Sequence, residues 1–118
     1  MSKSIKESLN HVHELLAQGK FIEAMETYLH EDVELREAND APKKGKAFNV
    51  DFEQKFIDEQ LAEFVRYDVF DVAVEGNQSF YTAEMELKLK NGETMLSQQA
   101  VATTWKDGKI YRERYYHA

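Results

Sequence analysis

The residues best suited to chemistry in this sequence are two acids, an amide and a histidine in its C-terminal half: Asp68, Glu113, Gln98 and His117. A carboxylate or an imidazole can remove a proton next to a carbonyl group. An amide or a phenol can donate a hydrogen bond to the enolate oxygen that results, and Gln98 and Tyr115 carry these groups. We expect Asp68 and His117 to supply the acid–base chemistry if the fold brings them into one pocket.

Each of these residues also has a structural interpretation. Asp68 and His117 can form an ion pair near an open end of a sheet with no ligand involved. Glu113 lies between Arg112 and Arg114, so an outward-facing ion network explains this acid as well as a pocket does. Ionisable groups are costly to bury unless they are paired, and their clustering on one apolar face therefore favours a wet, functional pocket.

A four-stranded antiparallel meander over residues 64–117 must position these side chains. Two-residue turns are predicted at Gly76-Asn77, Asn91-Gly92 and Asp107-Gly108, because each dipeptide tolerates the positive φ angles of type I′ or II′ turns. If no β-bulge intervenes, the three turns fix the register of all four strands.

This register predicts two different faces of the sheet. The inner face should be mostly apolar and meet the helices. It comprises Asp68, Phe70, Val72, Val74, Ser79, Tyr81, Ala83, Met85, Leu87, Leu89, Leu96, Gln98, Ala100, Ala102, Thr104, Tyr111, Glu113, Tyr115 and His117. On the outer face, Trp105 and Ile110 are mixed with charged residues. Exposed apolar area of this kind favours self-association, and we expect a homodimer through the outer sheet face.

Three helices are predicted ahead of the meander. The first begins at a capping box formed by Ser4 and Glu7, and the second covers about residues 20–30. Period-two alternation over residues 32–37 predicts a short strand, and a third helix follows at 48–61. Helices gathered before an antiparallel sheet indicate the α+β class, with the helices covering one face.

Four aromatic residues are further candidates for contact with a ligand. Phe52 and Phe56 lie on the apolar face of the third helix, where core packing is the more common role, although aromatic side chains also line apolar pockets. Tyr81 shares the predicted inner face with Glu113. Tyr28, on the second helix, is either a core aromatic with a solvated hydroxyl or a hydrogen-bond donor to the ligand.

Composition narrows the class of function. A chain of 118 residues with 42% hydrophobic content forms one domain over residues 1–118. The net charge of −7 repels phosphate, which argues against nucleic acids and anionic membranes as partners. There is no cysteine and no histidine pair at ligand spacing, so we expect no metal and no cofactor. No apolar run reaches the roughly 20 residues of a membrane span and no signal peptide is evident, so a cytoplasmic location is expected.

Two segments carry a family resemblance: the ending WKDGKIYRERYY (residues 105–116) and the segment KGKAF (residues 44–48) before the third helix. With them, the sequence resembles the nuclear transport factor 2-like superfamily, particularly its SnoaL-like and ketosteroid-isomerase-like branches. The resemblance implies a cone-shaped, cystatin-like α+β barrel, in which a curved antiparallel sheet wraps around three N-terminal helices and leaves a deep pocket. It also implies homodimers that pair through the outer sheet face.

The resemblance implies catalytic groups as well. SnoaL-like cyclases use an aspartate with a nearby histidine, and Asp68 and His117 are a similar pair. We therefore expect a pocket for a small, largely apolar carbonyl compound, with isomerase, cyclase or dehydratase chemistry that needs no cofactor. The alternative is a non-catalytic dimeric module with a vestigial pocket, which binds ligands or proteins. The hypotheses differ in whether Asp68, Gln98 and either His117 or Glu113 converge on a cavity.

Overall fold

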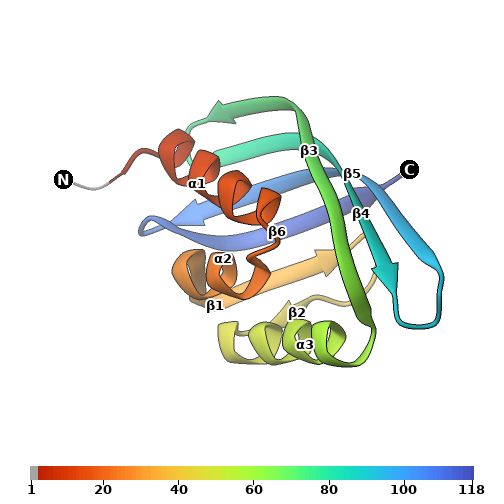
Figure 1. Cartoon of the computed structure of the whole chain (residues 1–118). Helices are drawn as coiled ribbons and strands as arrows, with labels where there is room; N and C mark the ends of the chain where they lie inside the picture. Colours follow the sequence, from red (N-terminus) through yellow and green to blue (C-terminus); the bar gives the residue numbers. More distant parts are fainter. Residues whose placement is uncertain (1–2) are drawn as a thin grey trace.

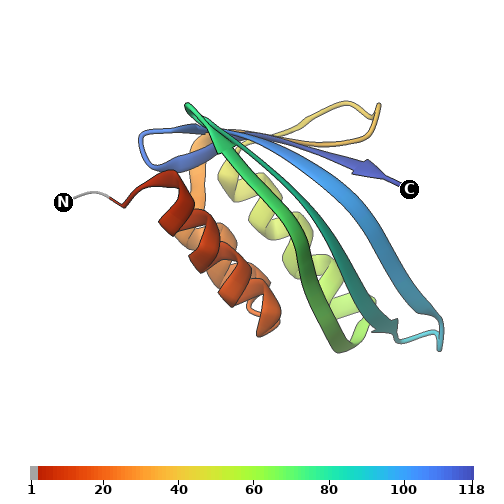
Figure 2. The ribbon, with the colours of Figure 1, turned by 90° about the horizontal axis from the view of Figure 1, so that it is seen from above.

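The computed structural model describes residues 3–118 as three helices and one six-stranded sheet. The N-terminal half contains α1 (Ile5–Ala17), α2 (Phe21–Tyr28), β1 (Leu29–Glu37), β2 (Lys43–Lys44) and α3 (Lys46–Glu59). The C-terminal half contains β3 (Leu61–Glu75), β4 (Gln78–Leu89), β5 (Thr94–Lys106) and β6 (Lys109–His117). The sheet curves over the helices, which all lie on its concave side (Figures 1 and 2). Within residues 3–118, none of the helices has the length and apolar content needed to cross a bilayer.

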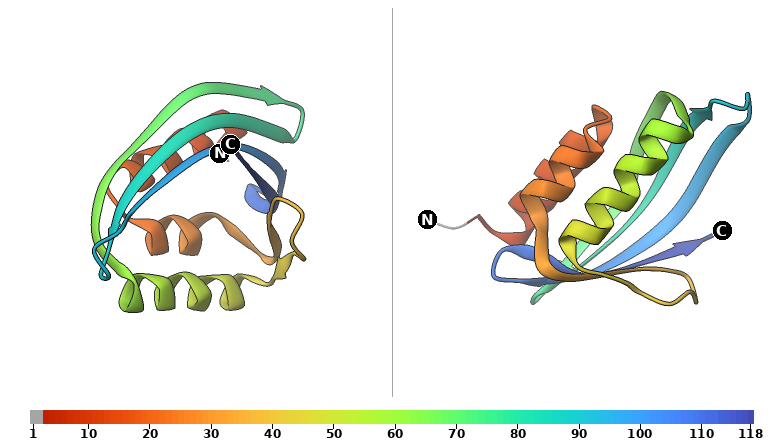
Figure 3. Two further views of the ribbon diagram at one scale, coloured as in Figure 1. Left: turned by 90° about the vertical axis from the view of Figure 1, so that its right-hand side faces the viewer. Right: turned by 90° about the horizontal axis from the view of Figure 1, so that it is seen from below.

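The strands are arranged in the order β2-β1-β6-β5-β4-β3. The predicted α+β class is confirmed, and the curved sheet wraps around the three helices to give the expected cone (Figure 3). The sheet departs from an antiparallel barrel in two respects. Strand β1 runs parallel to β6, and the sheet stays open, with β2 and β3 at its edges. Strand β2 lies between the predicted short strand and the predicted third helix.

The start of α1 follows the predicted capping box. The Ser4 hydroxyl accepts a hydrogen bond from the backbone N–H of Glu7 at 3.1 Å, and the Glu7 carboxylate accepts one from the backbone N–H of Ser4. Two N–H groups that have no partner within the helix are thereby satisfied. Leu9, Val12 and Leu15 then recur on one face of α1 and are buried against the sheet.

Three β-bulges bend β3 around the helices. Strand β3 has 15 residues and its partner β4 has 12, and the register shifts leave Ala62, Val65 and Phe70 without a partner on β4. Each bulge inserts one residue, kinks the strand and reverses which side the preceding residues face. The bulge at Phe70 places Tyr67 opposite Met85 on the concave face, whereas Asp68 points to the convex side.

The turn between β4 and β5 also differs from the prediction. Leu89 donates its N–H to the carbonyl of Glu93 at 2.9 Å, and Gly92 takes a φ of +91°. The loop therefore has three residues, with glycine in the left-handed position that such loops require. This shifts β5 by one residue relative to the predicted register, so that Ser97 and Gln99, rather than Gln98, face the concave side.

The turn between β5 and β6 has the predicted two residues. Asp107 and Gly108 have φ angles of +54° and +75°, as a type I′ turn requires. A register shift just after this turn leaves Tyr111 unpaired, which reverses the remainder of β6. This reversal cancels the one-residue shift of β5. The predicted inward orientation of Glu113, Tyr115 and His117 is consequently correct, although the predicted register is not.

The narrow end of the cone is closed by a packed core. Trp105 is 3% exposed; its indole N–H donates to the Ser79 hydroxyl at 2.9 Å and its ring packs edge-on to Tyr28. Ile110, opposite Trp105, is also buried. The prediction that Trp105 and Ile110 lie on the outer face is therefore wrong, because the shifted register of β5 turns them inward.

Candidate functional site

A cavity of about 440 Å³ lies between the concave face of the sheet and the three helices. Its walls are mostly apolar. Contributors include Leu16, Met25, Phe52, Phe56 and Met85. The two phenylalanines of α3 thus form part of the cavity wall and not of the buried core, and Phe52 is 51% exposed. The volume falls within the range of about 300–1,000 Å³ that is usual for ligand pockets.

One wall of the cavity is polar, and β6 provides it. Glu113, Tyr115 and His117 alternate along the strand, so all three side chains point to the cavity. The backbone of β6 stays paired with β5 as far as the Gln99–His117 pair. The backbone of the histidine is therefore part of the sheet.

Glu113 is at the centre of this wall. One carboxylate oxygen accepts a hydrogen bond from the Thr103 hydroxyl at 2.6 Å, and the other accepts one from the Tyr115 hydroxyl. Burial raises the pKa of Glu113, an effect that these two hydrogen bonds reduce and that the charge of Glu37 reinforces. The group therefore retains its proton to a higher pH than an exposed glutamate.

Tyrosine hydroxyls surround Glu113. Tyr81 and Tyr67 line the cavity beside it, and burial raises the pKa of each well above its usual range. Burial and the neighbouring charge of Glu113 raise the pKa of Tyr115 in the same way. These phenols stay protonated and keep a hydrogen to donate. The concave side therefore contains Tyr81, Tyr115 and Glu113, as predicted from the sequence.

The Tyr67 hydroxyl points to α1, where it lies 3.0 Å from Nδ1 of His13. Burial lowers the pKa of His13 to about 4, so its imidazole is neutral near pH 7. A neutral imidazole can accept a hydrogen bond from the Tyr67 hydroxyl, which links this tyrosine to α1.

His117 pairs with an acid that the sequence reasoning did not assign to it. Its Nε2 contacts the carboxylate of Glu37 at the end of β1. Both side chains line the cavity and are partly exposed, at 39% for His117 and 43% for Glu37, which places them at its mouth. The alternation of residues along β1 places Val33, Leu35 and Glu37 on one face of this strand. It does not predict that β1 pairs in parallel with β6, and this pairing brings Glu37 next to His117.

A third acid reaches the cavity from the opposite side. Glu53 lies on α3, and burial, followed by the charge of Glu37, raises its pKa. The start of α3 is fixed by Asn49, whose amide donates to the carbonyls of Lys43 and Gly45 at 3.0 and 2.8 Å. No spacing in the sequence distinguished Glu53 from the exposed acids of this helix.

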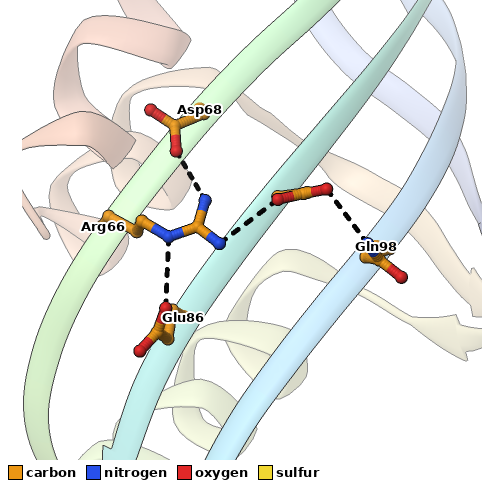
Figure 4. A network of polar contacts seen from close by, with 5 residues as sticks. Arg66, Asp68, Glu86 and Gln98 are labelled. Atoms are coloured by element: carbon orange, nitrogen blue, oxygen red, sulfur yellow. Dashed lines mark hydrogen bonds and ion pairs between the residues drawn. The ribbon is translucent and has the colours of Figure 1, made fainter.

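Asp68 and Gln98 do not reach the cavity. The bulge at Phe70 and the shifted β5 register place both on the convex face, where they belong to a network around Arg66 (Figure 4). Arg66 donates to Asp68 at 2.6 Å and also pairs with Glu84 and Glu86. Gln98 donates to Glu84 at 3.0 Å. These two residues therefore have a structural role on the outside of the sheet.

The expected pair of Asp68 with His117 is therefore replaced by Glu37 with His117. Gln98 is likewise replaced by Gln99, which lines the cavity. Tyr28 is also outside the cavity, because its side chain is buried at the narrow end and its hydroxyl is taken by His11 and Lys3. Among residues 3–118 no cluster of three or more histidine and acidic side chains has the geometry of a metal site.

The fold and cavity invite comparison with known proteins. No family model and no curated protein matches the sequence. Solved structures do match over almost the whole chain. One is a protein from Mesorhizobium loti assigned as a SnoaL-like polyketide cyclase, which has 27% identity and a TM-score of 0.81 over 97% of this chain and 99% of the other.

Two further structures show the same fold at lower identity. A nuclear transport factor 2-like protein of unknown function from Burkholderia pseudomallei has 12% identity and a TM-score of 0.80, covering 97% of this chain and 90% of its own. TerC, co-crystallised with polyporic acid, has 18% identity and a TM-score of 0.78, covering 97% and 91%. These matches confirm the resemblance that the sequence suggested.

Proposed function

We propose, on the premise that this chain is a SnoaL-like member of the nuclear transport factor 2-like superfamily, that its cavity binds a small, largely apolar carbonyl compound and moves a proton next to the carbonyl. The observation that carries the proposal is the cavity itself. It combines apolar walls with one polar wall, on which Glu113, Tyr115 and His117 stand in a row.

The proposed base is His117. If Nε2 carries the hydrogen and donates it to Glu37, Nδ1 has a free lone pair that can accept a proton from the ligand. The negative charge of Glu37 then stabilises the imidazolium that forms. This role requires the neutral form of His117 in the free protein.

The proposed donor to the developing enolate oxygen is Tyr115, with Glu113 behind it. Burial raises the pKa of both groups. The two side chains are hydrogen-bonded to each other, so a protonated Glu113 can donate its hydrogen to the Tyr115 oxygen, which leaves the Tyr115 hydrogen for the ligand. Ketosteroid isomerase stabilises its enolate in a comparable way, with a neutral carboxylic acid and a tyrosine. The same arrangement serves an isomerase, a cyclase or a dehydratase, because each proceeds through an enolate.

Similar proteins support the ligand class. The Mesorhizobium loti protein is assigned as a polyketide cyclase, and TerC was co-crystallised with polyporic acid, an organic molecule. The cavity of this chain has room for an organic ligand, and over residues 3–118 no arginine lines it to recognise phosphate.

The test uses 2-tetralone, a bicyclic ketone with acidic protons next to its carbonyl. We expect the ketone to raise the melting temperature and the protein to accelerate exchange of those protons in D₂O, measured by NMR. His117→Gln should slow the exchange by about a hundredfold, at the lower end of what a general base contributes. A matched variant, His30→Gln, removes a histidine that does not line the cavity and should leave the rate unchanged.

The outcomes separate binding from catalysis. A thermal shift without exchange would support ligand binding and eliminate the catalytic part of the proposal. Exchange that survives His117→Gln would remove this histidine as the base. If the ketone neither binds nor exchanges, the cavity does not have the proposed function.

A second candidate function rests on the convex face of the sheet. Phe80, Leu96 and Tyr116 are 43%, 51% and 47% exposed there. Exposed apolar area on a sheet favours pairing with a second copy or another protein. We propose that two copies of this chain pair through this face, whether or not the cavity is catalytic.

A further inference from the structure

Acidic side chains enter the cavity from three different elements: Glu37 from β1, Glu53 from α3 and Glu113 from β6. Burial raises the pKa of Glu53 and Glu113, and the charge of Glu37 raises both further. Three carboxyl groups around a mostly apolar volume are unfavourable for an empty or purely apolar cavity. Their arrangement therefore constrains the charge of the ligand.

Positive charge in the cavity is sparse. Within the described part of the chain, the lining contains one lysine, Lys43, one histidine, His117, and no arginine. The Lys43 ammonium lies 4.8 Å from the centre of the Phe52 ring at the side of the cavity, and His117 is already paired with Glu37. Besides the Glu37–His117 pair, the lining contains two further acids, Glu53 and Glu113, against one lysine. A ligand carboxylate would therefore meet more negative than positive charge.

We propose that the ligand of this cavity is an apolar molecule that carries one basic amine, and that the cavity discriminates against carboxylates. The inference rests on the proposed function, since it names the charge of the ligand in the same site. An ammonium group placed between Glu53 and the β6 wall would pair with the Glu53 carboxylate and accept no proton from the wall. A carboxylate in the same place would repel the Glu53 carboxylate or would have to take up a proton.

The geometry of the cavity suits such a molecule. Phe52 and Phe56 of α3 offer aromatic faces beside Glu53, and cations bind favourably over aromatic rings as well as next to carboxylates. Because the Lys43 ammonium already lies over the Phe52 ring, Phe56 is the ring that remains for the ammonium group of the ligand. The apolar part of the ligand would fill the volume between Met25, Leu16 and the sheet.

The experiment compares three molecules with one skeleton at pH 7: 2-tetralone, 2-aminotetralin and tetralin-2-carboxylate. Their affinities are measured by isothermal titration calorimetry on the full chain. We expect the amine to bind more tightly than the carboxylate by about tenfold or more, with the ketone between them. A tenfold ratio corresponds to about 1.4 kcal/mol.

Two matched variants locate the effect. Glu53→Gln removes a cavity acid and should reduce the preference for the amine severalfold. Glu59→Gln makes the same change of charge on an exposed residue of the same helix, outside the cavity, and should leave the preference unchanged. Both variants keep the shape of the side chain, and their melting temperatures show whether each one folds.

The results distinguish this inference from the proposed function. If the ketone binds but the carboxylate equals or exceeds the amine, the inference is overturned and the proposed function stands. Loss of carboxylate binding in Lys43→Gln would then identify Lys43 as the group that selects an anion. If none of the three molecules binds, the proposed function fails, and the inference fails with it.

Discussion

Glu113 has surroundings that folding alone does not require. Thr103 and Tyr115 each donate to its carboxylate, buried tyrosines line the cavity beside it, and the charge of Glu37 acts on it. These hydrogen bonds do not fully offset the cost of burial, since the pKa of Glu113 remains raised. A glutamine would fill the same space without a titratable charge. An acid kept at a net cost to stability is typical of functional sites.

This cost predicts how stability depends on pH. The folded-state pKa of Glu113 lies above its unfolded value, so its favourable contribution is complete below the unfolded pKa and is lost as pH rises through the folded pKa. Glu113→Gln does not titrate. The free energy of unfolding of this variant should therefore increase relative to the original protein as pH rises from about 4.5, by about 1.4 kcal/mol for each unit by which the pKa is raised.

Urea denaturation of both proteins between pH 4 and pH 8 measures this difference. The slope with pH is the informative quantity, because loss of the hydrogen bonds to Thr103 and Tyr115 lowers stability by a constant amount. Glu59→Gln, at an exposed position, should show no such slope. A flat difference for Glu113→Gln would mean that its pKa is ordinary in the folded state.

At the level of elements, β-bulges and one loop determined which side chains face the cavity. The helices, the meander and two of its three turns were predictable, because capping residues, periodicity and Gly-containing turns are local signals. The faces were not. A bulge at Phe70 and a three-residue loop before Glu93 each reversed one segment, and a sequence with several compatible loop lengths does not reveal such shifts.

These shifts moved some of the predicted site residues to the convex face and left others on the concave face. Asp68 lies before the Phe70 bulge, and Gln98 lies after the lengthened loop, so both moved to the convex face. Glu113 and His117 kept their predicted side because two reversals cancelled along β6. The partner of His117 came from β1, and a contact between strands about 80 residues apart follows only from the parallel pairing.

The bulge at Phe70 can be tested directly. Deleting Phe70 removes the extra residue, so the strand must either lose pairing or turn Tyr67 outward and Asp68 inward. Burying a charge and exposing a core tyrosine should reduce the free energy of unfolding by about 3 kcal/mol or more. Phe70→Ala keeps the bulge at a position that is 59% exposed, and should change stability by only about 0.5 kcal/mol.

Chemical denaturation compares the two variants with the original chain. Near-ultraviolet circular dichroism then reports whether the aromatic core still packs in the deletion variant. If deletion of Phe70 costs no more than Phe70→Ala, the bulge does not determine which side of β3 faces the core.

At the scale of the whole molecule, the two faces of the sheet have different roles. The concave face supplies the core and the cavity, whereas the convex face combines the Arg66 network with exposed apolar residues (Figure 4). Because alternate residues serve the two faces, a change on the convex face need not disturb the cavity. Self-association and ligand binding can therefore be tested independently.

Phe80 provides this test, since it is 43% exposed on the convex face while its neighbour Tyr81 is buried on the concave one. If two copies pair through the convex face, Phe80→Arg places a charge in a surface that is dehydrated on pairing, and light scattering should show the mass of a monomer. Phe48→Arg introduces the same charge at a position of α3 that is 55% exposed and should leave the dimer intact. An unchanged mass for Phe80→Arg, or a monomeric original chain, would contradict pairing through this face. A Phe80→Arg monomer that still binds 2-tetralone would show that the cavity acts within one chain, whereas loss of binding would mean that pairing shapes the cavity.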